Sequence, residues 1–311
     1  MWRYVGLRIL DAIPTVILAL TLVFIALRLL PGDPAQVALG EFATPEQVAA
    51  LRAKMGLDVP IWQQYFTFLW STATFSFGTS FSSSVPVRDI LLQNLPFTIE
   101  LTFLATIFGL IMGIPLGVIS ATRRGTRVDF GSRIFALVGF AIPDFYLGAL
   151  LLIWLSLEWG LFPISGGGTN IADRLDHLIL PALALGFIKA AFLSRLTRGT
   201  LLEVLGRDYI RTARAKGARE PRVVYRHGLR NAMLPVSTGL ALSILSTLSG
   251  SVAIELIFNR PGIGSMLVDA ISTRDYPVVQ AGLIVFALFV VGVNLVMDLI
   301  NIVIDPRIKV S

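Results

Sequence analysis

The stretch TRGTLLEVLGRDYIRTARAKGAREPRVVYRHGLR, residues 197–230, lies between two strongly apolar segments and decides how the rest of the chain is arranged. It carries nine Lys and Arg residues against three acids. Basic loops beside membrane spans stay on the cytoplasmic side of the membrane. We therefore expect this stretch to be a cytoplasmic loop between two spans of a membrane protein.

The same stretch contains helix signals. Apolar residues between Leu202 and Ala213 recur at helical spacing, while arginines occupy another face. Gly217 predicts the end of this helix, because Gly adopts the left-handed conformation without steric cost, and Pro221 predicts the start of a second short helix. Two short amphipathic helices of this kind either rest on anionic lipid headgroups or are held by a partner protein.

The composition is that of a membrane protein. Of the 311 residues, 55% are hydrophobic and 15% are charged, and the mean hydropathy is +0.76. A soluble domain carries about 25% charged residues. The net charge of +6 is concentrated beside apolar segments, which argues against nucleic acid as a partner. The absence of cysteine and the presence of only two histidines argue against disulfides and metal sites.

A helix needs about 20 apolar residues to cross the membrane core. We expect an all-α polytopic fold with six such helices in a single transmembrane domain over residues 1–311. No small-residue cleavage site follows the first helix, which predicts that it is retained. The expected spans are about Ile9–Leu30, Pro96–Ala121, Ile134–Leu157, Leu178–Leu196, Leu234–Ile257 and Val278–Ile304.

Basic residues gather before the first span, after the second, in the 197–233 loop and after the last span. This distribution places both termini in the cytoplasm. Outside the loop, the basic residues that support this orientation are Arg3, Arg8, Arg123, Arg124, Arg127, Arg133, Arg307 and Lys309.

An insert, residues 31–95, separates the first two spans and is expected on the periplasmic side. Thr44 predicts a helix start and Gly56 its end, and a second helix is expected from about Pro60 to Trp70. Either the insert caps the outer ends of the spans, or it is a scoop that guides cargo into a pore. Aromatic residues in the second helix suit a membrane–water interface: Trp62, Tyr65, Phe66, Phe68 and Trp70.

The fifth span is unusually polar for a membrane helix. Small and hydroxyl residues allow close helix packing, and they also suit the wall of a translocation pathway that binds cargo weakly. The two interpretations stay open for different faces of the helix. The pathway candidates are Ser243, Ser246, Thr247, Ser249 and Gly250.

Four ionisable residues fall in or near the spans. Glu100 and Glu255 lie near the expected outer ends and are expected to be wet, whereas Lys189 is expected to snorkel. Asp298 is the deepest acid by this count. A proton-coupled carrier would use such a residue as its relay.

No catalytic constellation is visible in the sequence. The phosphate-binding pattern G-x-x-x-x-G-K-[ST] is absent, so we do not expect this chain to bind or hydrolyse ATP. No Ser/His/Asp arrangement or pair of carboxylates has interpretable spacing. The chain is expected to be a non-enzymatic subunit with no catalytic residues and no bound cofactor.

Several motifs resemble one family. DYIRTARAKG (208–217) and RHGLRNAMLPV (226–236) are similar to the coupling loop of ABC importer permeases of the dipeptide/oligopeptide/nickel branch. GDPA (32–35) with LRAKMGLD (51–58), the segment 255–280 and the DPR at 305–307 resemble the same branch. The resemblance implies a coupling helix at about Leu205–Gly217 that docks into a cytoplasmic ATPase. The implied coupling residues are Leu205, Asp208, Tyr209, Arg211, Thr212, Ala213, Arg214, Ala215, Lys216 and Gly217.

The resemblance also implies a periplasmic gate and a set of partners. The gate residues would be Asn259, Pro261, Gly262 and Gly264. The partners would be a second homologous permease subunit, two cytoplasmic ATPase subunits that hold ATP and Mg²⁺, and an extracytoplasmic substrate-binding protein, in a bacterial or archaeal inner membrane. The cargo stays open among dipeptides, oligopeptides, glutathione-like molecules, opines and nickel chelates.

Two other classes remain as alternatives. A stand-alone secondary transporter driven by an ion gradient would work without nucleotide and would need Asp298 or Glu100. A membrane anchor or receptor without transport has no use for a polar fifth span. The ABC importer permease is the hypothesis that accounts for most of the sequence.

Overall fold

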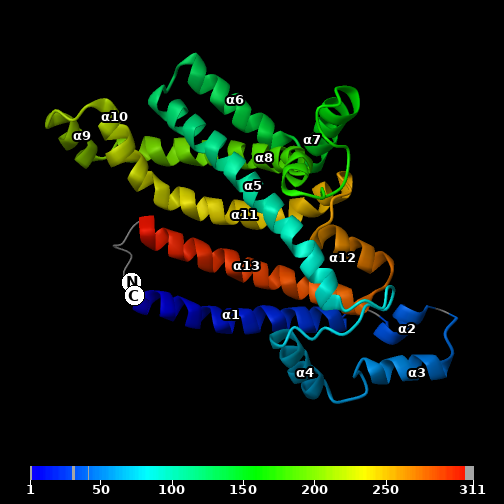
Figure 1. Cartoon of the computed structure of the whole chain (residues 1–311). Coiled ribbons are helices and arrows are strands. Elements are labelled where there is room, and N and C mark those ends of the chain that lie inside the picture. Colours follow the sequence, from blue (N-terminus) through cyan, green and yellow to red (C-terminus); the bar gives the residue numbers. More distant parts are fainter. Residues whose placement is uncertain (1, 30–31, 41, 305–311) are drawn as a thin grey trace. The chain divides into compact units, whose positions relative to one another are not determined.

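The computed structural model describes residues 2–29, 32–40 and 42–304. The predicted features at Leu30, Pro31, Arg307, Lys309 and the DPR sequence lie outside these residues, and Arg3 and Arg8 lie outside the described side chains. Regular structure in the described part of the chain is helical, apart from one isolated bridge between Thr79 and Pro86. An all-α fold is therefore confirmed (Figure 1).

The helices follow one another along the chain with short connections (Figure 1). Two of them, η1 and η2, are π-helical segments. The elements are α1 Trp2–Leu29, α2 Pro34–Leu39, α3 Pro45–Lys54, α4 Ile61–Ala73, α5 Val87–Thr122, α6 Arg127–Ala141, α7 Asp144–Leu151, η1 Leu152–Glu158, α8 Ile171–Leu205, α9 Asp208–Ala215, α10 Glu220–Arg222, η2 Val223–Leu229, α11 Arg230–Ile257, α12 Ile263–Ser272 and α13 Tyr276–Ile304.

Five helices among the described residues are long and apolar enough to cross a membrane. They cover five of the six expected spans: Leu10–Leu29, Val87–Thr122, Ile171–Leu205, Glu220–Ile257 and Tyr276–Asn301. The remaining expected span, Ile134–Leu157, is broken between α6 and α7 by a bend of 99°. The pair α6 and α7–η1 is therefore either one broken span or a re-entrant segment.

The break has a local cause at Pro143. Pro143 has no backbone N–H to donate, and its ring disfavours the helical conformation of the preceding residue. Ile142 is accordingly extended, with φ −93° and ψ 122°. Asp144 then begins α7 in its first turn, where an acidic side chain is favoured by the helix dipole. The expectation of one continuous helix from Ile134 to Leu157 is wrong for this reason.

Contacts divide the described chain into two compact units. The first unit contains residues 2–96 and 262–295, and the second contains residues 97–261 and 296–304. Each unit is described by itself. The single transmembrane domain over residues 1–311 stays a prediction.

The core of the first unit joins α1, α4 and α13. Leu20 and Phe24 of α1 pack with Phe68 of α4 and Ile284 of α13. A second cluster joins the start of α5 to α12 and α13 through buried aliphatic residues: Val87, Leu91, Ile263, Met266, Leu267, Ala270, Val278 and Ala281.

The helix signals in the insert are confirmed. Thr44 caps α3 in a capping box, because its hydroxyl accepts a hydrogen bond from the Gln47 N–H and the Gln47 side chain accepts one from the Thr44 N–H. Gly56 follows the C-cap residue with φ +66°. The second helix, α4, begins at Ile61 and ends at Ala73, three residues beyond the expected end.

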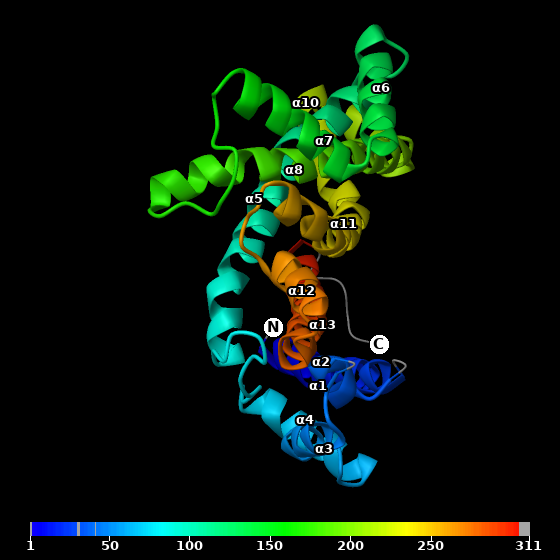
Figure 2. The ribbon, with the colours of Figure 1, turned by 90° about the vertical axis from the view of Figure 1, so that its right-hand side faces the viewer.

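The second unit is built on α8, which packs against α6, α7 and α11 (Figures 1 and 2). Helix α5 approaches α8 closely along a ladder of glycines. A Cβ atom at Gly113 would lie 2.7 Å from the Ala190 carbonyl oxygen, and one at Gly117 would lie 2.7 Å from that of Ser194. Small residues four positions apart allow this close contact between membrane helices. The ladder thereby fixes α5 against the part of α8 that lines the candidate site.

Candidate functional site

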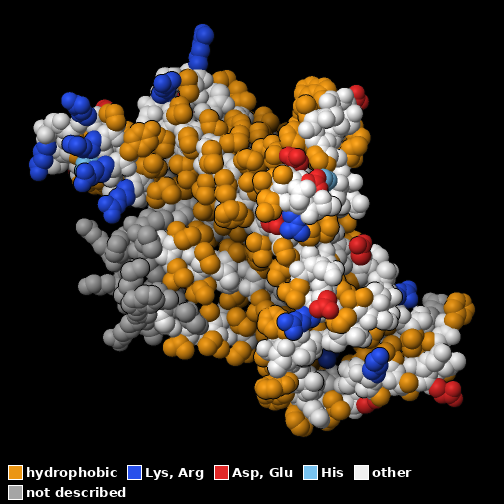
Figure 3. Space-filling model, in the orientation of Figure 1, with side chains coloured by type: hydrophobic (Ala, Val, Ile, Leu, Met, Phe, Trp, Pro, Cys, Tyr) orange, Lys and Arg blue, Asp and Glu red, His pale blue; other side chains and the backbone are white. Residues whose placement is uncertain are grey.

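The predicted coupling loop forms a separate basic surface made of α9, α10 and η2. Blue side chains gather over α9 and α10 in Figure 3. The predicted single helix from Leu205 to Gly217 is wrong in one respect: Leu205 ends α8, and α9 begins only at Asp208. Gly206 caps α8, and Arg207 is extended with φ −76° and ψ 152°, so the chain turns before α9.

The end of α9 is the one that the sequence predicts. Gly217 has φ +78°. Its N–H donates to the Arg214 carbonyl at 2.9 Å, and the Ala218 N–H donates to the Ala213 carbonyl at 3.1 Å. This pair of bonds is a Schellman motif, which satisfies the last carbonyls of the helix. The start of α10 at Glu220, with Pro221 in its first turn, is also confirmed.

One buried residue holds α9 in place. Ile210 is completely buried, and the Tyr209 hydroxyl accepts a hydrogen bond from Asn231 Nδ2 at 2.9 Å. Most of the predicted coupling residues are exposed: Asp208, Tyr209, Arg211, Thr212, Arg214, Ala215, Lys216 and Gly217, with Leu205 and Ala213 half-buried. A basic helix that is anchored by Ile210 and by the Tyr209–Asn231 hydrogen bond, with its other side chains mostly exposed, is a surface available to a partner.

The surface is connected to the spans through η2. Gly228 of η2 packs on α8, where a Cβ atom would lie 3.0 Å from Leu201 and 3.1 Å from Leu205. Val223 and Val224 of η2 are buried, and η2 continues directly into α11. A displacement of α9 and α10 would therefore act on α8 and α11 together.

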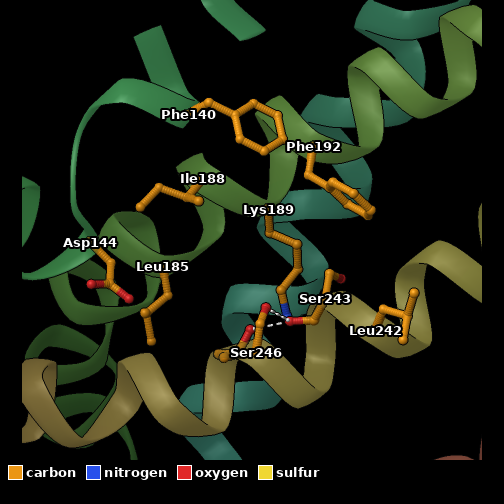
Figure 4. Close-up of a pocket in the computed structure, with 10 residues that line it drawn as sticks. Phe140, Asp144, Leu185, Ile188, Lys189, Phe192, Leu242, Ser243 and Ser246 are labelled. Atoms are coloured by element: carbon orange, nitrogen blue, oxygen red, sulfur yellow. Dashed lines mark hydrogen bonds between the residues drawn. The ribbon is translucent and has the colours of Figure 1, made fainter. Parts of the chain in front are cut away.

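The second candidate site is a cavity of about 320 Å³ in the second unit (Figure 4). Three of the five predicted pathway residues line it: Ser243, Ser246 and Thr247. Ser249 is exposed elsewhere on α11, and Gly250 packs on the Asp144 carboxylate, to which a Cβ atom would come within 2.1 Å. The full lining is Phe140, Asp144, Leu185, Ile188, Lys189, Phe192, Leu242, Ser243, Ser246 and Thr247.

The hydroxyl groups of the cavity wall donate within their own helix. Ser246 Oγ and Thr247 Oγ1 donate to the Ser243 carbonyl at 2.9 and 2.7 Å (Figure 4). Ser243 Oγ donates to the Leu240 carbonyl at 2.8 Å. Their lone pairs remain available to accept. The wall formed by α11 is thus weakly polar and uncharged, and its role as a translocation pathway stays a prediction.

Lys189 brings a buried amino group to this cavity, a position that was not expected from the sequence. Its side chain is 2% exposed, and Nζ donates to Thr106 Oγ1 at 2.7 Å. The expectation that Lys189 snorkels to the interface is therefore wrong. Asp144 lines the other side of the same cavity (Figure 4). The cavity combines apolar walls with one amino group and one carboxyl group.

The acids expected near the outer ends behave differently from each other. Glu100 is about one-third exposed and pairs with Arg174 at 3.3 Å and with Arg260 at 3.0 Å; that it is wet stays a prediction. Glu255 is completely buried and accepts a hydrogen bond from Thr98 Oγ1 at 2.7 Å. The expectation that Glu255 is wet is wrong.

The predicted gate residues fall in both units. Asn259 has φ +42°. Asn259 and Pro261 belong to the second unit, which ends at Pro261 in this part of the chain. Gly262 is extended at the start of α12, and Gly264 is buried within that helix. Their joint role as a gate stays a prediction. Asp298 is half-buried in α13, and its role as a proton relay also stays a prediction.

Among the described residues, no group of three or more His, Asp or Glu side chains could hold a metal ion. The features that remain are several membrane-crossing helices, an exposed basic helix pair joined to two of them, and a weakly polar cavity between helices. Together they are the features of a polytopic membrane protein with a cytoplasmic-type basic loop and an internal cavity.

Comparison with known sequences identifies the family. The family model "Binding-protein-dependent transport system inner membrane component" matches residues 113–310, and the model of the N-terminal part of this membrane component matches residues 1–102. The chain belongs to this family.

Curated relatives cover the whole chain. It is 39% identical to the dipeptide transport system permease protein DppB of Escherichia coli K12 over 99% of both chains. It is 40% identical to the oligopeptide transport system permease protein AppB of Bacillus subtilis 168, over 99% of this chain and 100% of the relative. It is also 40% identical to the glutathione transport system permease protein GsiC of Escherichia coli K12 over 99% of both chains.

A solved structure shares the fold. A chain of the MetNI methionine ABC transporter, in an inward-facing conformation, matches with a TM-score of 0.57 and 20% identity. The match covers 70% of this chain and 98% of that chain. This likeness confirms the arrangement of helices expected for an ABC importer permease.

Proposed function

We propose that this chain is the pore-forming subunit of an ATP-driven importer for peptides or related small solutes. The observation that carries the proposal is its full-length similarity to dipeptide, oligopeptide and glutathione permeases. The cavity of about 320 Å³, with an amino group and a carboxyl group in its lining, supports a cargo that carries both charges.

In this proposal α9 is the coupling helix, and ATP is bound and hydrolysed by two partner ATPase subunits. Closure of the ATPases would displace α9 and α10, and η2 would pass the displacement to α8 and α11. The cavity between these helices would then alternate between two states of access. A second permease subunit and an extracytoplasmic binding protein complete the assembly. The basic loop and both termini would face the cytoplasm.

The test is purification of the full chain in mild detergent, followed by identification of the bound proteins. We expect two ATPase chains and a second permease. Proteoliposomes of the purified complex should take up peptide only when ATP is present on the side of the membrane that carries the ATPase subunits. The binding protein must be present on the opposite side. Recovery of this chain alone, with uptake driven by an ion gradient and without nucleotide, would overturn the proposal in favour of a secondary transporter.

A further inference from the structure

Helix α4, Ile61–Ala73, has an exposed aromatic face that its own unit does not cover. Trp62, Phe66 and Trp70 follow one another at intervals of four residues and are 63%, 62% and 72% exposed. The opposite face is packed: Phe68 and Thr72 are buried. The helix contains no Asp, Glu, Lys or Arg residue over its whole length.

The position of α4 along α1 places it at membrane depth. Tyr65 Oη and Thr21 Oγ1 are hydrogen-bonded at 2.7 Å, and the Arg28 guanidinium donates to Gln64 Oε1 at 3.0 Å. Thr21 and Arg28 belong to the second half of the membrane-crossing segment Leu10–Leu29. At about 1.5 Å per residue, the contacts cover the last ~14 Å of that span, within a hydrocarbon core about 30 Å thick.

Helix α4 runs across α1 rather than along it (Figure 1). Its 13 residues make a helix about 20 Å long, which is too short to cross the membrane. Its contacts do not order the two ends of α4 by depth, because Gln64 meets Arg28 near the end of α1 while the next residue, Tyr65, meets Thr21 further into the span. Phe68 packs with Phe24, between these two positions, at 5.4 Å between ring centroids. Helix α4 as a whole therefore lies against the second half of the span.

Lipid is the partner that fits this face. The side chains of α1 that flank the contact with α4 are themselves exposed and apolar: Leu18, Leu22, Ile25 and Leu29. We expect these α1 side chains to face lipid, because α1 is long and apolar enough to cross a membrane, and the exposed aromatic face of α4 belongs to the same unit. Tryptophan is favoured at the boundary between headgroups and acyl chains, and a charge-free helix carries no charged group that must stay in water. A water-facing surface of this size would leave a large apolar patch exposed.

We infer that α4 is an interfacial helix whose Trp62, Phe66 and Trp70 side chains are immersed in the lipid leaflet in which α1 ends. The helix would anchor the base of the insert in the membrane, so that α2 and α3 are held at the membrane surface. This inference does not depend on the cargo or on the partner ATPases.

The absence of cysteine from the sequence makes a direct test possible. Trp62→Cys, Phe66→Cys and Trp70→Cys in the full chain are labelled with a nitroxide and reconstituted in phosphatidylcholine/phosphatidylglycerol vesicles. Collision with oxygen reports lipid, and collision with a water-soluble nickel chelate reports water. Leu22→Cys, on the exposed face of α1, is the matched lipid control, and Lys54→Cys, exposed on α3, is the matched water control.

We expect all three labels to match the oxygen-dominated ratio of Leu22. A ratio like that of Lys54 would overturn the inference, as would loss of collisions with both reagents, which would mean that protein covers the face. The native rings are tested by the quenching of tryptophan fluorescence with brominated lipids. Trp62→Phe and Trp70→Phe must each remove part of the fluorescence quenching that the unmodified chain shows. Unchanged quenching in both variants would also contradict the inference.

Discussion

The carboxylate of Asp129 and the guanidinium of Arg198 form two parallel hydrogen bonds, 2.8 Å from Nε to Oδ1 and 3.0 Å from Nη2 to Oδ2. Asp129 lies in the first turn of α6 and is 1% exposed. The same carboxylate accepts hydrogen bonds from Ser120 Oγ at 2.6 Å and from the Gly125 N–H at 3.0 Å. One buried acid therefore joins the end of α5, the start of α6 and the C-terminal part of α8.

Replacement of this acid, Asp129→Asn, is expected to destabilise the second unit by about 1.5–3 kcal/mol, because it removes the charge from the hydrogen-bonded pair with Arg198, whose side chain is partly exposed. Denaturant unfolding of the purified chain in detergent measures the loss. Arg133→Gln is the control, since Arg133 is exposed and lies 3.8 Å from the same carboxylate, and should change stability by less than about 1 kcal/mol. Equal effects of the two variants would show that the Asp129–Arg198 pair is not a structural link.

The glycine ladder of α5 gives a second prediction. Gly113→Ala places a methyl group 2.7 Å from the Ala190 carbonyl oxygen, so α5 and α8 must separate, at a cost of about 1–3 kcal/mol. Gly131→Ala in α6 is the matched control, because no atom lies within 4 Å of its Cβ position, and it should be neutral or stabilising by up to about 1 kcal/mol. Thermal unfolding of both variants checks the difference, and a stable Gly113→Ala chain would contradict the close approach.

The sequence predicts most of the helices because their signals are local. A helix cap predicts the start of α3, a glycine predicts the end of α9, and the length of the apolar segments predicts most of the spans. Proline alone does not decide a break, since Pro14, Pro181 and Pro235 lie inside intact helices. At Pro143 the proline is followed directly by Asp144, which starts a new helix. The Pro143–Asp144 dipeptide therefore indicates the bend. The apolar residues on both sides of it favour one continuous span, and this pattern outweighs the dipeptide when the sequence is read alone.

The partners of buried charges could not be predicted in the same way. Lys189 donates to Thr106, 83 residues earlier in the chain, and Glu255 accepts from Thr98, 157 residues earlier. The position of a charged residue along a span predicts how far its side chain lies from water. It does not predict which helix packs beside that side chain, and this packing decides whether the side chain snorkels or lines a cavity.

A pH dependence is expected at Asp275, outside the spans. Burial alone would raise the pKa of Asp275, but hydrogen bonds from the Ser80 and Ser82 hydroxyls and from the Phe81 and Ser82 N–H groups outweigh it and leave this pKa below its usual value. The stability that these bonds provide is present above the unfolded pKa, about 3.9, and is lost as pH falls through the folded-state pKa.

Hydrogen exchange at the Phe81 and Ser82 amides measures this contribution. Asp275→Asn should reduce their protection at neutral pH, and its difference from the unmodified chain should shrink as the pH falls through the folded-state pKa. Asp269→Asn, at an exposed position of α12, should leave both amides protected. A difference that persists unchanged to strongly acid pH would contradict the role of the Asp275 charge.

The turn after α9 gives a prediction about coupling. Gly217 has φ +78°, a conformation that costs a residue with a side chain about 1–2 kcal/mol. Gly217→Val should therefore lower peptide uptake per ATP hydrolysed by about 5- to 30-fold, the factor that corresponds to this energy, while membrane insertion stays intact. Gly199→Ala in α8, where no atom lies within 4 Å of the Cβ position, should keep normal coupling. Unchanged uptake in Gly217→Val would count against α9 as the coupling helix.

The cavity provides the last prediction, at Lys189. Lys189→Met keeps the apolar stem that packs on Gly109 but removes the charge and its hydrogen bond to Thr106. A charge-assisted hydrogen bond to cargo is worth about 1.5–3 kcal/mol, which corresponds to about 10- to 100-fold in uptake below saturation. We expect a loss of this size in proteoliposomes, with ATPase binding unchanged because α9 is untouched. Lys189→Arg, which keeps the charge, should retain most of the uptake, and Thr106→Val separates the effect of the helix contact from that of the charge. Normal uptake by Lys189→Met would place the translocation pathway outside this cavity. A solute that passes through the cavity would contact the altered side chain, and its uptake would change.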